Sequence, residues 1–201
     1  QTMNHHYQTI DSFFDSFDLP SATRLMQKLI KTADAEKIWK GVPADALCFT
    51  SRLEDLITAV FELVQQYNYK PEVMIKNEKR EEVWMLTCFE TYCGWHTGKT
   101  PWDFFPRHLS KKEFLNPDLV LNKFTSYKTL SEWKYLLNDL LSHALSIERI
   151  TDFDTGESLL STSQQLHKLI EATHLIEVRQ STPQPKPRRK WKHPAETVTG
   201  I

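Results

Sequence analysis

An amphipathic helix is predicted most clearly by residues 43–67, PADALCFTSRLEDLITAVFELVQQY. A proline opens this run, at the first-turn position that suits its fixed φ angle and missing N–H group. Apolar side chains then recur every three or four residues, as the spacing of one helix face requires. They are Leu53, Leu56, Ile57, Val60, Phe61 and Val64. A helix with such a stripe needs partner elements to cover it.

Other segments of the chain show the same helical spacing. Six of the ten prolines lie in the body of the chain, mostly where a helix would start. Apolar side chains at helical spacing predict further helices over residues 6–17, 21–31, 72–95, 133–145 and 157–178. The helix over 72–95 is apolar on most of its surface, so we expect it at the centre of the fold.

Short elements are predicted between Gly94 and Tyr127, where the apolar pattern breaks into pieces. Ser110 with Glu113, and Thr129 with Glu132, have the spacing of a capping box, which starts a helix. Glycine is scarce: five of the 201 residues are Gly, whereas the usual share of about 7% would give roughly fourteen. We therefore predict an all-α fold, an irregular bundle of five to seven helices formed by residues 1–179 as one domain.

Several classes of protein are excluded or disfavoured by composition. No apolar run approaches the ~20 residues that a membrane-spanning helix needs. The N-terminal residues show no basic patch followed by an apolar segment, so secretion is not indicated. Cys48, Cys88 and Cys93 are too few for a disulfide framework, which indicates a reducing compartment and hence the cytoplasm.

The C-terminal segment, residues 180–201, differs in composition from the rest of the chain. It contains four prolines, five Lys or Arg residues and one Glu, a net charge of +4, which leaves −5 for the rest of a chain whose net charge is −1. We predict a flexible tail, because this segment has too few apolar groups to offset the entropy of ordering. The candidate anion-binding residues are Lys186, Arg188, Arg189, Lys190, Trp191 and Lys192.

A candidate metal site lies on the last predicted helix. His167, Glu171 and His174 are spaced at i, i+4 and i+7, which places them along one edge of a helix. Imidazole and carboxylate groups bind zinc, iron or manganese, and Glu171 with His174 has the Glu-x-x-His spacing of di-metal helical bundles. A polar edge with an ion pair between Glu171 and a neighbouring cation explains the same residues.

The most unusual local composition lies between residues 95 and 108. Its aromatic rings and polar groups predict either a ligand pocket or an apolar plug at one end of the bundle. The candidate pocket residues are His96, Trp102, Asp103, Phe105, Arg107 and His108.

The sequence contains no complete set of catalytic residues and indicates no cofactor. It therefore favours a non-catalytic helical adaptor or regulatory module that binds a protein or another anionic partner with help from the tail. One alternative is a metal-dependent helical-bundle enzyme that uses His167, Glu171 and His174. A second alternative is an accessory protein that binds nucleic acid through the basic tail.

Overall fold

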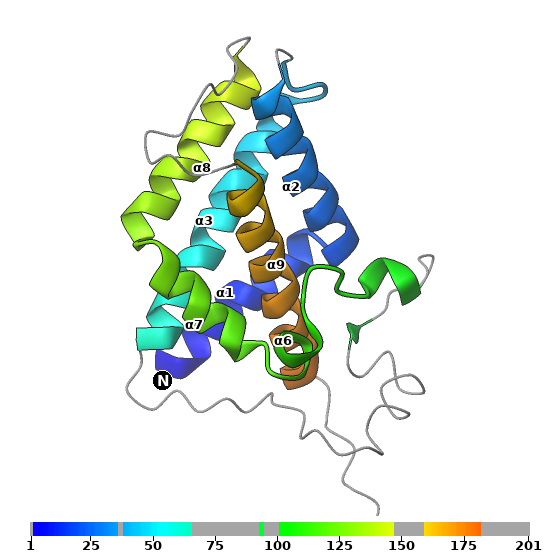
Figure 1. The fold of residues 1–201 in the computed structure, drawn as a ribbon, viewed down its shortest axis with the longest axis vertical. Coiled ribbons are helices and arrows are strands. Elements are labelled where there is room, and N and C mark those ends of the chain that lie inside the picture. The colour runs from blue at the N-terminus through cyan, green and yellow to red at the C-terminus, as the bar shows by residue number, and fades with distance from the viewer. Residues whose placement is uncertain (1, 36–37, 66–92, 95–100, 147–158, 182–201) are drawn as a thin grey trace, which may run out of the picture.

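The computed structural model describes residues 2–35, 38–65, 93–94, 101–146 and 159–181. Within these ranges the chain forms seven α-helices and one short 3-10 helix, and no strand (Figure 1). They are α1 (Thr2–Ser16), α2 (Leu19–Asp34), α3 (Pro43–Gln65), η1 (Pro101–Phe104), α6 (Lys111–Leu115), α7 (Asp118–Tyr127), α8 (Leu130–Leu145) and α9 (Leu159–Ser181). The predicted all-α bundle is confirmed.

The helix starts follow the local signals in the sequence. Pro20 lies in the first turn of α2, and the side chain of Asp18 accepts a hydrogen bond from the Ser21 amide at 3.0 Å. Both predicted capping boxes form, at Ser110 before α6 and at Thr129 before α8. The short elements η1, α6 and α7 lie where the broken apolar pattern placed them.

Helix α9 lies at the centre of the described bundle (Figure 1). Helices α1, α2, α6 and α7 pack against it, and every residue from Leu169 to Ile176 is buried. Its polar residues are therefore buried together with its apolar ones. The helix that the sequence placed at the centre, residues 72–95, lies outside the described residues except for Cys93 and Gly94.

One apolar core joins α8 to the rest of the bundle. Trp133 is fully buried, and its ring stacks on Phe124 of α7 with a centroid distance of 4.2 Å and an interplanar angle of 7°. The rings of Phe13, in α1, and Phe17, just after α1, pack on Phe49 of α3. Helix α8 packs on α2 and α3, and α7 packs on both α3 and α9, so all of these helices share the core.

The C-terminal limit of the helical part lies slightly beyond the predicted one. Helix α9 runs to Ser181, so residues 180 and 181, assigned to the tail from the sequence, are helical. Residues 182–201, with all six candidate anion-binding residues, lie outside the described part of the chain. Among the residues described, no helix is long and apolar enough to cross a bilayer.

Candidate functional site

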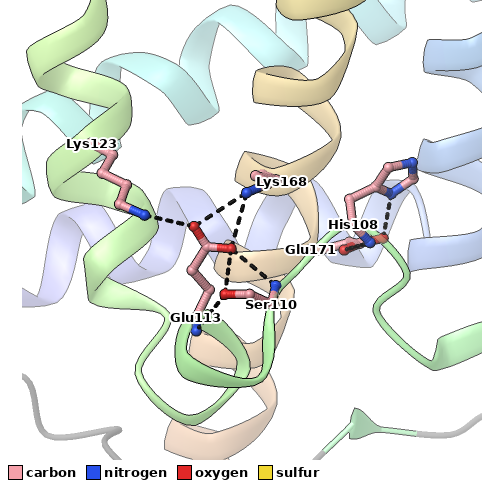
Figure 2. A network of polar contacts seen from close by, with 6 residues as sticks. All are labelled: His108, Ser110, Glu113, Lys123, Lys168 and Glu171. Atoms are coloured by element: carbon pink, nitrogen blue, oxygen red, sulfur yellow. Dashed lines mark hydrogen bonds and ion pairs between the residues drawn. The ribbon is translucent and has the colours of Figure 1, made fainter.

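The carboxylate of Glu171, on α9, holds the segment that leads from η1 to α6 (Figure 2). Its side chain is only 4% exposed. Oε1 accepts a hydrogen bond from the Arg107 amide at 2.9 Å, and Oε2 accepts one from the His108 amide at 2.8 Å. Nδ1 of His108 lies 2.7 Å from Oε1. A carboxylate can only accept when ionised, so Nδ1 carries the proton and the ring is fixed in one orientation.

The ring of His108 lies against that of His167, with a centroid distance of 4.6 Å. Nδ1 of His167 lies 2.7 Å from the Ser163 carbonyl oxygen, one turn earlier on α9, to which it donates. Burial lowers the pKa of His167, and the neighbouring His108 lowers it further, although the bond to Ser163 opposes this. His167 is therefore a neutral, buried packing group rather than a charged one.

The three predicted metal ligands are used in separate contacts. His174 places Nε2 2.8 Å from the carbonyl oxygen of Cys93, away from the Glu171 carboxylate and its bonds to residues 107 and 108. Within the described ranges, no group of three or more His, Cys, Asp and Glu side chains is arranged to hold a metal ion. Glu171 and His174 bind backbone groups of other segments, and His167 binds a carbonyl oxygen of its own helix.

Metal removal tests this assignment directly. We expect purified protein to contain less than about 0.1 equivalent of zinc, iron or manganese. Dialysis against EDTA should leave the melting temperature unchanged to within about 1 °C, because the His167, Glu171 and His174 side chains have protein partners. Stoichiometric metal that is lost in the Glu171→Gln variant would contradict the expectation.

A second buried carboxylate, Glu113 of α6, lies beside the first (Figure 2). It closes the capping box with Ser110 and pairs with Lys123 of α7 at 2.9 Å and Lys168 of α9 at 3.0 Å. Burial alone would raise the pKa of Glu113, but the Ser110 amide and the two ammonium groups lower it to about 2. Glu113 and Glu171 together fix α6 and the preceding segment on α9.

The predicted pocket residues do not converge. His96 lies outside the described residues, and the His108 ring turns inward to Glu171. Phe104 is fully buried and fills the predicted role of a plug, whereas Trp102 is 73% exposed and Phe105 is 42% exposed. Asp103 and Arg107 are also exposed. The segment thus places one ring in the core and presents others on the surface.

The two exposed rings and the half-buried Phe114 form a small surface, which we call the aromatic platform: Trp102, Phe105 and Phe114. Trp102 and Phe105 meet edge to face at a centroid distance of 6.3 Å, and Phe105 stacks on Phe114 at 6.1 Å. The guanidinium of Arg179 lies 4.7 Å from the centre of the Phe114 ring, on which it stacks. Each ring is thereby held by a neighbour.

Three cationic side chains lie close in sequence to the rings of the aromatic platform. Arg107 donates to the Trp102 carbonyl oxygen at 3.4 Å and is exposed, as are Lys111 and Lys112 of α6. Asp103 is the acidic side chain of the same segment. The platform therefore combines apolar rings with a local excess of positive charge.

One buried acid of this region makes stability depend on pH. Asp118, at the start of α7, is 2% exposed, and burial raises its pKa to about 6, although its own amide and the charge of Arg179 lower it in part. The folded chain binds this proton more tightly than the unfolded chain, in which the Asp118 carboxyl has its ordinary pKa of 3.8. The associated stability is complete below pH ~4 and is lost as the pH rises through ~6.

Replacing Asp118 with Asn should therefore raise the unfolding free energy by about 2 kcal/mol at pH 7 and leave it nearly unchanged at pH ~3.5. The neutral amide has nearly the same shape and carries no charge to desolvate. Urea denaturation at both pH values measures the difference. A variant less stable than the parent at pH 7 would show that the ionised group has a favourable partner.

A basic groove on α2 was missed by the sequence reasoning. Arg24, Lys28 and Lys31 line it, and their spacing of four and three residues would have placed them on one helix face. The Glu171 contacts had no such signal, because their partners lie 63 and 64 residues away along the chain. Comparison with known proteins found no matching family model, no matching curated protein and no matching solved structure.

Proposed function

We propose that this protein is a non-catalytic helical module that binds an acidic segment of a protein partner through the aromatic platform. The observation that supports this most is the exposure of Trp102, at 73%, in a segment whose backbone is fixed by a buried carboxylate. Large exposed aromatic side chains next to arginine are the residues that most often dominate the energy of protein interfaces.

The platform is held in place before any partner arrives. Glu171 binds the amides of residues 107 and 108. Phe104, which lies between Trp102 and Phe105 in the sequence, is buried in the core. A surface that is ordered in advance loses little conformational entropy on binding, which favours affinity.

The charge around the platform favours an acidic partner. Arg107, Lys111 and Lys112 lie on the exposed side of the segment and of α6. Complementary charge accelerates encounter and selects among partners. The five cations of residues 186–192 add to this attraction if they reach the same partner, which is the role the sequence predicts for the tail.

A defined probe tests the proposal. Random 12-residue peptides would be selected on the full chain, and the affinity of the selected peptides measured by fluorescence anisotropy. We expect peptides rich in Asp and Glu around one or two apolar residues, bound at least about tenfold more weakly by Trp102→Ala. The matched control is Tyr135→Ala on α8, whose side chain is 68% exposed, and which should leave the affinity unchanged.

Three results would contradict the proposal. Selected peptides could lack acidic residues, or Trp102→Ala could bind them as the parent does. Tighter binding of a single-stranded oligonucleotide, falling steeply between about 50 and 200 mM salt and lost on replacing the tail cations with Gln, would instead favour nucleic-acid binding.

A further inference from the structure

A groove of about 470 Å³ lies between α2, from Arg24 onward, and residues 38–40. It is lined by Arg24, Gln27, Lys28, Lys31, Thr32, Ala35, Ile38 and Lys40. Among the described residues that line it, every ionisable side chain is a cation, although residues 1–179 as a whole have a net charge of −5. A concave surface to which the described residues contribute four cations concentrates anions.

The fold holds the walls of this groove. The ammonium group of Lys28 lies 3.8 Å from the centre of the Trp39 ring and donates to the carbonyl oxygen of Lys40. The Trp39 amide donates to the carbonyl oxygen of Ala144 at 2.8 Å, which ties residues 38–40 to the end of α8. The cations of α2 and Lys40 are thus presented from two segments that are fixed relative to each other.

One exposed aliphatic side chain lines the groove, and two more follow it closely in the sequence. Ile38 lines it and is 49% exposed, and Val42 and Leu47 follow at 59% and 50% exposure in the turn and first helical turns of α3. This is the end of the bundle where α2 finishes and α3 begins (Figure 1). Asp34 and Asp45 are exposed in the same region, but neither lines the groove.

We propose that this end of the bundle docks on an anionic lipid bilayer, with lipid phosphate groups in the basic groove. Cations beside aliphatic side chains match the bilayer interface, where phosphates lie next to hydrocarbon. A nucleic acid would gain from exposed aromatic rings on which bases stack, and the exposed side chains here are aliphatic. A soluble phosphate would gain nothing from Val42 and Leu47.

Co-sedimentation of the full chain with lipid vesicles tests this. We expect binding to vesicles with about 30% phosphatidylglycerol and little binding to neutral phosphatidylcholine vesicles. Arg24→Gln with Lys31→Gln should weaken binding at least about tenfold, because two cations leave the groove. The matched control Arg52→Gln with Lys134→Gln removes the same charge from α3 and α8 and should have a smaller effect of about twofold or less.

The tail cations require a separate control, since they also attract anionic lipid. A full-length chain with Gln in place of Lys186, Arg188, Arg189, Lys190 and Lys192 should retain groove-dependent binding. Loss of all binding in this tail variant, with no loss in Arg24→Gln with Lys31→Gln, would overturn the proposal.

Substitution of the exposed aliphatic residues distinguishes binding to a bilayer from binding to other phosphate ligands. Val42→Ser with Leu47→Ser changes exposed side chains only, so the fold should be retained, and vesicle binding should fall about fivefold or more. If the variant binds vesicles as the parent does, the bilayer proposal is wrong. It is equally wrong if inorganic phosphate or an oligonucleotide binds in the groove and vesicles do not. The Trp102→Ala variant should bind vesicles normally, so this result is independent of the aromatic platform.

Discussion

The Glu171→Ala variant is expected to lose about 3–5 kcal/mol of unfolding free energy. The substitution leaves the amides of residues 107 and 108 and the Nδ1–H group of His108 without their acceptor, in a site where the carboxylate was 4% exposed. Buried donors without acceptors are costly because they have also lost water. Urea denaturation of the full chain, followed by circular dichroism, measures the loss.

The Glu171→Gln variant provides the control for shape. The Gln amide keeps one oxygen acceptor and places an N–H donor where the second acceptor was. We therefore expect a loss of about 2 kcal/mol of unfolding free energy. A loss below about 1 kcal/mol in both variants would show that the segment is held by other contacts. The folded Glu171→Gln variant should also bind the selected acidic peptides more weakly, although its side chain is buried and cannot touch them.

The Trp133→Ala variant should also lose about 3–5 kcal/mol of unfolding free energy. The Trp133 ring is fully buried and stacked on Phe124, so its removal leaves a cavity where α7, α8 and α3 meet. Thermal and urea denaturation measure the effect. The variant should keep its helical content if it folds, because α8 has a capping box at Thr129 that does not depend on this ring.

Two control variants test whether the lost stability comes from the buried Trp133 ring. The Trp133→Phe variant keeps a ring against Phe124 and should lose only about 1–2 kcal/mol of unfolding free energy. Tyr135→Ala, two residues away on the exposed face of α8, should change stability by less than about 0.5 kcal/mol. Equal losses in Trp133→Ala and Tyr135→Ala would mean that burial of the Trp133 ring does not account for the loss, because alanine favours the helix at both positions.

The sequence by itself determined the helices and where several of them begin. Pro20, Ser110 and Thr129 act within one helical turn, through a proline ring or a side-chain bond to an amide three residues on. The apolar stripe of residues 43–67 likewise depends only on helical periodicity, and α3 forms over Pro43–Gln65. Interactions within one helical turn can be predicted from residues that are close together in the sequence.

The tertiary structure alone decided what the polar edge of α9 binds. His167, Glu171 and His174 share that edge, as their spacing predicted, but each acts on a different backbone group, and two of these groups come from other segments of the chain. The same holds for the split of the aromatic segment into a buried Phe104 and an exposed Trp102. Spacing fixes the direction of a side chain from its own helix, whereas its partner depends on which distant segment packs there, and that is settled by the packing of the whole core.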